Sequence, residues 1–216
     1  MIEQRIRDIS GIKYYAASHP RVRKYYRQGN RPREFGSKVW ATTLVVLERL
    51  SQEEKNFSNL KVLEIGCGWG LLGIFLAKKF SCRVTVSDLD KNVLPLVEMQ
   101  AKINNVHIET KVSSFNELST RYLTNFDLVI GSEICYSDEV AEDLRKLIER
   151  CLAAKVGKII LADPGRPDFK ELMLKLTTSY KVQVEILPGS ANGKKTYLLS
   201  IEQNLQEQEL YEEKKD

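Results

Sequence analysis

The feature that most constrains the fold is a short apolar run that ends in closely spaced glycines. Residues 61–65 are mostly apolar and β-branched, which predicts a buried central strand of a parallel sheet. Gly66, Gly68 and Gly70 follow at alternate positions. Glycine there permits a positive φ and lets a ligand approach the backbone. Residues 71–80 then have helical periodicity, and the N-terminal amides of that helix would point at a ligand over the loop. We therefore expect a ligand site here. The alternatives are a tight structural turn and a nucleotide site.

Strand-like and helix-like segments alternate along the rest of the chain. Short apolar or alternating runs predict strands over residues 61–65, 83–87, 106–112, 126–131 and 156–162. Residues 38–50, 92–104, 139–153 and 168–179 have helical patterns, with Ser137 placed to cap one helix. Such alternation predicts an α/β fold: a Rossmann-like, doubly wound, mostly parallel seven-stranded sheet. Two further strands, 181–187 and 195–202, have no helix between them and predict a C-terminal antiparallel hairpin.

Charge divides the chain into three parts. Residues 1–36 are rich in Lys and Arg and are expected to form an N-terminal helical arm, residues 37–202 the main domain, and residues 203–216 an acidic polar tail. The pairs Tyr14-Tyr15 and Tyr25-Tyr26 stand among the basic residues of the arm. Aromatic and basic residues together can bind nucleic acid, but we favour tyrosines that pack the arm onto the core. The basic arm could also steer an acidic partner, or be a solvated face.

Composition predicts one cytoplasmic domain that is not inserted in a membrane. The 216 residues are 43% apolar, enough for one core, and no apolar run is long enough to span a membrane. The first residues lack the pattern of a signal peptide. Cys67, Cys82, Cys135 and Cys151 form no C-x-x-C pair and are expected to be reduced core residues. The two histidines lie far apart, so we expect no metal site, and nothing in the sequence requires more than a monomer.

The glycine loop resembles the first motif of the class I S-adenosylmethionine (SAM) methyltransferases, (V/I)-L-(D/E)-x-G-x-G-x-G. Glu64 stands two places before the first glycine, and the spacing differs from the G-x-G-x-x-G of dinucleotide sites. The resemblance implies SAM as cofactor and S-adenosylhomocysteine as product, without a metal. It implies cofactor contacts from this stretch, namely Glu64, Gly66, Cys67, Gly68 and Gly70.

The ends of the next two strands supply further candidates for this cofactor site. Asp88 ends the second strand, and a carboxylate there can accept both ribose hydroxyls. Leu89 would flank the adenine, whereas Asp90 is expected to cap the next helix. Ser114 and Phe115 follow the third strand, where the family contacts the adenine; a plain turn is the alternative.

The fourth strand leads into Ser132, Glu133 and, three residues later, Tyr136. No N/D-P-P-Y/F motif of nucleic-acid base methyltransferases follows this strand. Glu133-Ile134-Cys135-Tyr136 instead resembles the (D/E)-x-x-Y signature of the seven-strand protein lysine methyltransferases. The resemblance implies a catalytic Glu133 beside the methyl donor, a Tyr136 that walls the substrate channel, and a cofactor contact from Ser132. A capping acid and a rim aromatic are the alternatives for Glu133 and Tyr136.

Two more segments agree with this resemblance. Val39-Trp40-Ala41-Thr42-Thr43-Leu44 is similar to the family's W-x-(A/S)-x-x-L helix, which implies that Trp40 contacts SAM or the substrate channel; a core tryptophan is the alternative. Residues 163–166, Asp-Pro-Gly-Arg, resemble a loop of the branch that modifies the electron-transfer flavoprotein β subunit. Arg166 is therefore expected to bind an acidic patch on a protein substrate, or else to be solvated.

The leading functional hypothesis is SAM-dependent N-methylation of a lysine in a protein substrate. A lysine amine must be neutral to attack, and an apolar site beside a sulfonium favours the neutral form. Glu133 would orient the amine or receive its proton through water. The alternatives are a small-molecule methyltransferase of the nicotinamide or amine type and a SAM-binding protein without activity. Nucleic-acid and membrane partners are not expected.

Overall fold

The predicted seven-stranded sheet is present in the structure. The computed structural model describes residues 5–33, 35–53, 57–189 and 194–202, and within them the sheet has the strand order β5-β4-β3-β6-β7-β9-β8. β3 to β7 pair in parallel, and β9 runs antiparallel to both β7 and β8, which confirms the expected fold and its C-terminal hairpin. The strands are β3 (Lys61–Ile65), β4 (Arg83–Asp88), β5 (Glu109–Val112), β6 (Leu128–Ser132), β7 (Lys158–Asp163), β8 (Val182–Pro188) and β9 (Lys195–Glu202).

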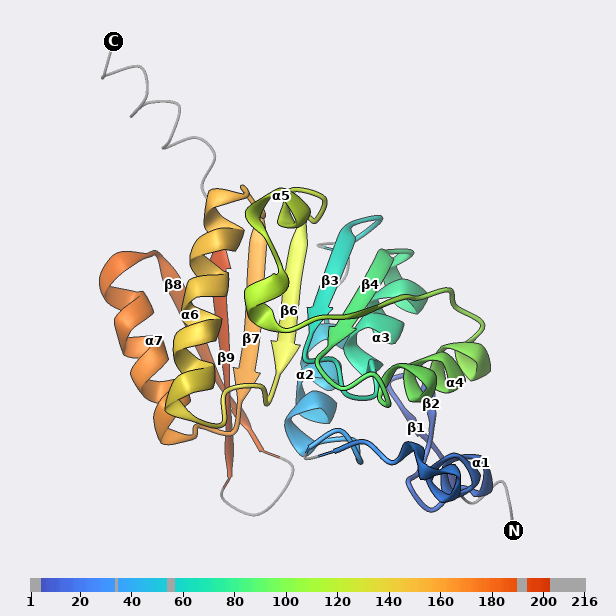
Figure 1. Ribbon diagram of the computed structural model, residues 1–216. Coiled ribbons are helices and arrows are strands. Elements are labelled where there is room, and N and C mark those ends of the chain that lie inside the picture. The colour runs from blue at the N-terminus through green and yellow to red at the C-terminus, as the bar shows by residue number, and fades with distance from the viewer. Residues whose placement is uncertain (1–4, 34, 54–56, 190–193, 203–216) are drawn as a thin grey trace.

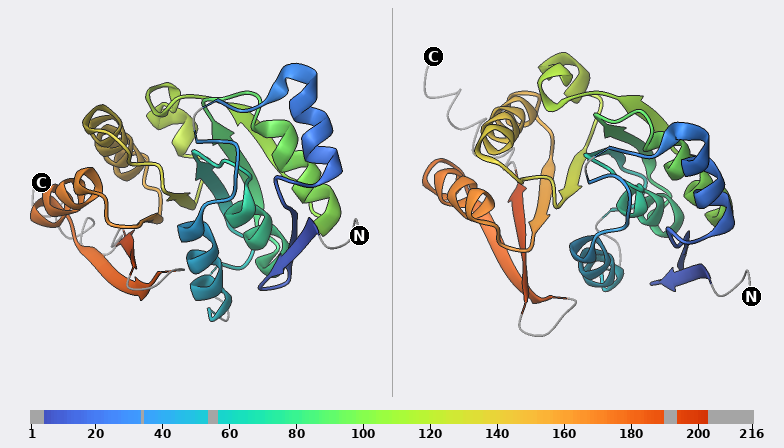
Figure 2. Two further views of the ribbon diagram at one scale, coloured as in Figure 1. Left: turned by 90° about the horizontal axis from the view of Figure 1, so that it is seen from below. Right: turned by 60° about the horizontal axis from the view of Figure 1, so that its bottom comes forward.

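Helices cover both faces of this sheet (Figures 1 and 2). One face carries α2, α3 and α4, and the other carries α5, α6 and α7. The buried side chains form two clusters, one on each face of the sheet, because successive side chains of a strand point to opposite faces. In β3, Val62 belongs to one cluster and Leu63 to the other. The helices are α2 (Ala41–Ser51), α3 (Leu71–Phe80), α4 (Leu94–Asn104), the 3₁₀ turn η3 (Phe115–Glu117), α5 (Thr120–Leu123), α6 (Asp138–Ala153) and α7 (Pro167–Ser179).

The order of the strands places a ligand crevice at one point of the sheet. The chain proceeds outward from β3 through β4 to β5, then returns to the other side of β3 with β6 and β7. Connections therefore leave β3 and β6 in opposite directions, and a ligand crevice is expected at their carboxyl ends. The glycine loop follows β3 and Glu133 follows β6, so the predicted site residues meet at this switch point.

The prediction of a helical arm over residues 1–36 is wrong for the first part of the arm. β1 (Ile6–Ile9) and β2 (Ile12–Tyr15) form an antiparallel hairpin, and only then do α1 (Pro20–Tyr25) and the π-helical turn η2 (Tyr26–Asn30) follow. Ser10 and Gly11 have φ values of 49° and 80°, which suits a two-residue hairpin turn. The Ser-Gly pair between apolar residues was the sequence signal for this turn.

The hairpin is held by α4 rather than by the main sheet. The backbone of Lys13 donates to Asn104 Oδ1 at 3.0 Å and its carbonyl accepts from Asn104 Nδ2 at 2.6 Å. The amide of Tyr15 donates to Gln100 Oε1 at 2.8 Å. Tyr14 and Tyr15 are buried, which confirms that these tyrosines pack the arm onto the core. The tail predicted at 203–216 lies outside the described residues.

Candidate functional site

The glycine loop leaves open space at its centre. Gly66, Gly68 and Gly70 all have positive φ values, of 54°, 51° and 68°. A Cβ atom on Gly66 would lie 2.5 Å from Ile134 Cγ2, whereas a Cβ on Gly68 would meet no atom within 4 Å. Gly66 is therefore required by packing between the β3 and β6 loops. Gly68 borders free space in which a ligand can approach the backbone, and these residues fit the predicted cofactor.

Asp88 lies directly beside this space. Its Oδ2 accepts a hydrogen bond from the amide of Gly68 at 3.0 Å, and its Oδ1 accepts from the amide of Asp90 at 3.0 Å. Burial raises the pKa of Asp88. Leu89 is 70% exposed at the same edge, as an apolar residue that flanks a ligand ring would be. Asp90 accepts from the amide of Asn92 in the turn before α4, but it does not cap that helix, whose N-cap residue is Val93.

Glu64 supports the loop from behind. Its side chain is buried, and Oε2 accepts a hydrogen bond from the amide of Gly73 in the first turn of α3 at 2.8 Å. Burial, the largest cause, raises the pKa of Glu64 to about 8. Cys67 is buried too, and its amide donates to the carbonyl of Ser87 at 3.0 Å. Both residues therefore hold the loop in place, and their contacts with a cofactor remain predictions.

The stability of the protein is expected to fall between pH 5 and 8 because of Glu64. The folded protein keeps a proton on Glu64 up to about pH 8, whereas the unfolded chain releases it near the ordinary pKa of 4.5. The folded state thus binds more protons, and the free energy of unfolding declines by up to about 1.4 kcal/mol per pH unit. Urea unfolding at pH 5.5, 6.5 and 7.5 should show this slope and lose most of it in Glu64→Gln. The exposed Glu98→Gln is the control; an unchanged slope in Glu64→Gln would contradict the assignment.

Glu133 occupies a strained position at the end of β6. Its φ is 58°, and its amide donates to the carbonyl of Ala162 at 2.8 Å. Its Oε1 accepts from the amide of Thr42, in the first turn of α2, at 2.8 Å. The carboxylate therefore caps α2, as one predicted alternative held, and it does so at the carboxyl edge where Ile134 packs on Gly66. Strain of this kind in a non-glycine residue is common at functional sites.

Arg166 points inward at this carboxylate. Its guanidinium lies 3.2 Å from Glu133 Oε2 and 3.2 Å from Asp163 Oδ2, and it also donates to the carbonyls of Glu133 and Cys135. The second oxygen of Asp163 accepts from the amides of Gly165 and Arg166. These contacts engage the guanidinium with carboxylates and carbonyls of its own chain and hold the β6 loop beside Asp163. The expected contact of Arg166 with an acidic patch on a substrate remains a prediction.

Removing Arg166 is expected to destabilise the fold. In Arg166→Met the fully buried Asp163 side chain loses its cationic partner, and the free energy of unfolding should fall by about 2 kcal/mol. Arg145 on α6 also bridges two carboxylates, Glu142 and Glu149, but at the surface. Arg145→Met is therefore a matched control with an expected loss below about 1 kcal/mol. Equal losses in the two variants, measured by urea unfolding, would contradict this account.

Three aromatic rings gather beside Glu133, and we call them the aromatic trio: Phe35, Trp40 and Tyr136. The ring centroids of Phe35 and Tyr136 are 4.9 Å apart, and those of Phe35 and Trp40 are 5.8 Å apart. The indole of Trp40 donates to the carbonyl of Phe35 at 2.9 Å. Phe35 and Tyr136 are 48% and 41% exposed. Trp40 thus belongs to the rim of the site rather than to the core.

The remaining predicted cofactor residues have local partners. The amide and hydroxyl of Ser114 donate to Glu117 in a capping box that opens η3, so the turn predicted as the alternative is present. The ring of Phe115 is near Gly66, 4.0 Å from where its Cβ would stand. The hydroxyl of Ser132 accepts from that of Thr43 at 3.3 Å. Their contacts with a cofactor remain predictions.

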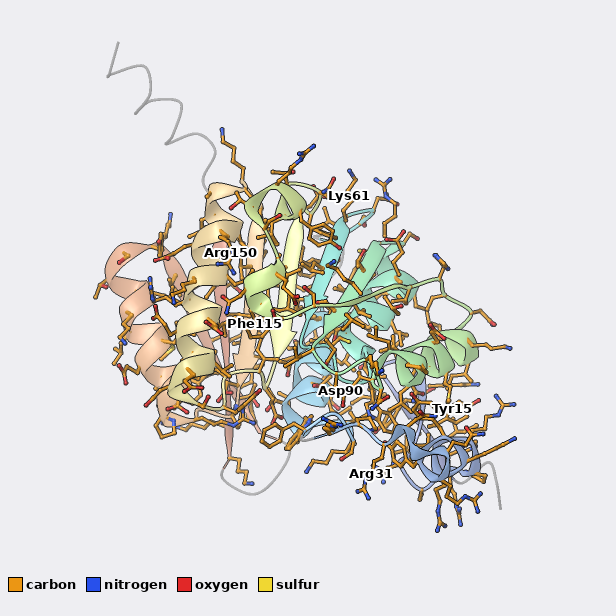
Figure 3. The ribbon with its side chains drawn as sticks, viewed as in Figure 1. Tyr15, Arg31, Lys61, Asp90, Phe115 and Arg150 are labelled. Carbon is orange, nitrogen blue, oxygen red and sulfur yellow. The ribbon has the colours of Figure 1, made fainter. Side chains whose placement is uncertain are left out.

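A segment of the arm crosses the carboxyl edge, and we call it the strap: residues 31–40, without residue 34. The amide of Arg33 donates to Asp90 at 2.5 Å, and the indole of Trp69 donates to the carbonyl of Gly36 at 3.0 Å. Figure 3 shows Asp90 and Arg31 at this edge, with Lys61 at the opposite end of the sheet. The strap thus ties the arm to the glycine loop and brings Phe35 to Tyr136.

Three residues of the site escaped sequence reasoning. Thr42 acts through its backbone amide, which no side-chain pattern reveals. Asp163 begins the Asp-Pro-Gly-Arg loop, three residues before Arg166, and this spacing could have predicted the ion pair between them. Phe35 lies in a polar loop, where its contact with Tyr136 depends on the tertiary fold.

Comparison with known proteins places the chain in a family. The family model described as lysine methyltransferase matches residues 27–179, which is most of the chain. The chain belongs to the lysine methyltransferase family. It is 28% identical to the histidine protein methyltransferase 1 homolog of Mus musculus, over 63% of this chain and 38% of that protein. It is 26% identical to the electron transfer flavoprotein beta subunit lysine methyltransferase of Rattus norvegicus, over 50% of this chain and 42% of that protein.

A solved structure shares the fold of this chain. The tRNA (uracil-54, C5)-methyltransferase of Pyrococcus abyssi in complex with S-adenosyl-L-homocysteine superposes with a TM-score of 0.57 at 18% identity, over 91% of this chain and 43% of that one. At that identity the likeness shows the fold alone. The chain spans less than half the length of each of these relatives.

Two other expectations, on a membrane-spanning helix and on a metal site, can be compared with the described residues. None of the helices among them is long and apolar enough to cross a membrane. No group of three or more His, Cys, Asp or Glu side chains in the described ranges is placed to hold a metal ion. The cytoplasmic location, the monomeric state and the absence of a metal remain predictions.

Proposed function

We propose that this protein transfers a methyl group from SAM to a lysine side chain of another protein. The observation that carries the proposal is the position of Glu133. Its carboxylate is held by the amide of Thr42 and by Arg166 at the carboxyl edge of the sheet, and its neighbour Ile134 packs on the glycine loop. Family membership and the relatives that methylate proteins by name support the reading, and they do not favour the nicotinamide-type alternative.

The residues of the chain have separate parts in this proposal. The amides of the glycine loop and the carboxylate of Asp88 bind the cofactor, Asp88 through the ribose hydroxyls. When bound, SAM supplies a methyl group that is already electrophilic. The protein then acts mainly by positioning the amine in line with it. Glu133 orients the amine and receives its proton through water.

Histidine is the second candidate for the methylated residue. It is favoured by the similarity to histidine protein methyltransferases, which is as strong as that to the lysine-specific relatives. The family description and an aromatic rim that already contacts a lysine ammonium favour lysine.

The test is transfer of tritiated methyl from SAM to a size-fractionated lysate. A labelled protein band that Glu133→Ala fails to produce supports the proposal, and mass spectrometry of the band identifies lysine or histidine. Label confined to small molecules, or retained in full by Glu133→Ala, would overturn it.

A further inference from the structure

The aromatic trio exposes apolar rings at a place where core packing does not account for them. Phe35 and Trp40 come from the strap, and Tyr136 follows β6, so two segments distant in sequence bring the rings together. Phe35 and Tyr136 remain almost half exposed. Large apolar side chains gathered on a surface commonly mark a binding site.

One cation of the chain already uses this surface. The ammonium of Lys38 lies 3.9 Å from the centroid of the Trp40 ring, well inside the range of a cation–π interaction. Lys38 is exposed and forms no ion pair within the part of the chain that the structure describes. The ring face of Trp40 is therefore what attracts this ammonium.

The neighbouring carboxylate does not compete for the same cation. The side chain of Glu133 is 6% exposed, and its two oxygens accept from Thr42 and Arg166. A ligand at the exposed faces of the trio thus meets rings, whereas the carboxylate of Glu133, to which we assign the substrate amine, is buried. Ring faces suit a methylated ammonium, as in the aromatic cages that recognise methyl-lysine.

We propose that Phe35, Trp40 and Tyr136 form a binding site for a methylated lysine ammonium, with Lys38 as an internal competitor. This proposal rests on the proposed function, because methyl-lysine is the product of that reaction and the trio would bind it at the rim of the site. It predicts that removing the charge of Lys38 strengthens binding of the ligand, a direction that a merely structural role for Lys38 would not give.

The test follows tryptophan fluorescence of the full chain during titration with N-acetyl-trimethyllysine methylamide. Trp69 is 3% exposed and should contribute a constant background, so the change reports Trp40. We expect saturable binding, at least about fivefold weaker for the neutral analogue in which carbon replaces the charged nitrogen. Phe35→Leu should weaken binding about threefold or more, and Lys38→Gln should strengthen it by a similar factor.

Arg33→Gln is the matched control for Lys38→Gln. It removes a positive charge from the same strap, and the Arg33 side chain makes no ring contact in the described structure. Absence of saturable binding, equal binding of the neutral analogue, or equal effects of Lys38→Gln and Arg33→Gln would each overturn the proposal. The titration needs no methyl transfer, so its failure is distinct from failure of the proposed function.

Discussion

Glu133→Gln is expected to lower the rate of methyl transfer by about 10²–10³-fold and to change the affinity for SAM by no more than about threefold. Glutamine keeps the size of the side chain and an oxygen that accepts from the amide of Thr42. It removes the negative charge that pairs with Arg166 and that we assign to the substrate amine. The helix cap therefore survives, and the chemical role is lost.

The measurement combines tritium transfer to the labelled protein at saturating SAM with calorimetric titration of SAM. Glu185→Gln is the matched control, since Glu185 also pairs with an arginine, Arg49, but at the surface between α2 and β8. Full activity of Glu133→Gln would remove Glu133 from the mechanism. Loss of SAM binding as well would assign it a structural role.

Gly68→Val is expected to weaken SAM binding by at least about 100-fold. The space beyond Gly68 is open to 4 Å, and an isopropyl group would occupy the volume that we assign to the cofactor. The residue also has a φ of 51°, which a β-branched side chain tolerates poorly. Weakened binding therefore has two sources, occupied space and backbone strain, which a control must separate.

Gly11→Val provides that control. Gly11 also has a positive φ, of 80°, and open space around its absent Cβ, but it lies in the turn of the N-terminal hairpin. Both variants should lose stability in urea unfolding, since both force valine into a left-handed conformation. If Gly68→Val bound SAM as Gly11→Val does, the glycine loop would not be the cofactor site.

The sheet was predictable because its signals are local. Buried parallel strands are short apolar runs, and five alternations with helices leave few topologies. For the N-terminal hairpin the Ser10-Gly11 turn was a local signal, but the partners that hold its second strand are the side-chain amides of Gln100 and Asn104, some 90 positions away along the chain. No local pattern in residues 6–15 records such a partner.

The positions of several candidate site residues at the strand ends were predictable, and their contacts were less so. Asp88 accepts from the amide of Gly68, and Ile134, the neighbour of Glu133, packs on Gly66, as the strand ends require. The inward direction of Arg166 depends on Asp163 and on two carbonyls of the β6 loop, which the sequence alone does not place. The contact between Phe35 and Tyr136 depends likewise on where the strap crosses the sheet.

The hydrogen bonds between the hairpin and α4 cross the boundary predicted at residue 36 between the arm and the main domain. Ile12, Tyr14 and Tyr15 belong to the same core cluster as α3 and α4. A chain shortened to residue 37 would uncover these apolar contacts, remove the partner of the Gln100 side-chain oxygen and remove two of the hydrogen bonds of Asn104. The arm is therefore expected to unfold together with the sheet as one cooperative unit, and residue 36 is not expected to be a boundary between separately folding parts.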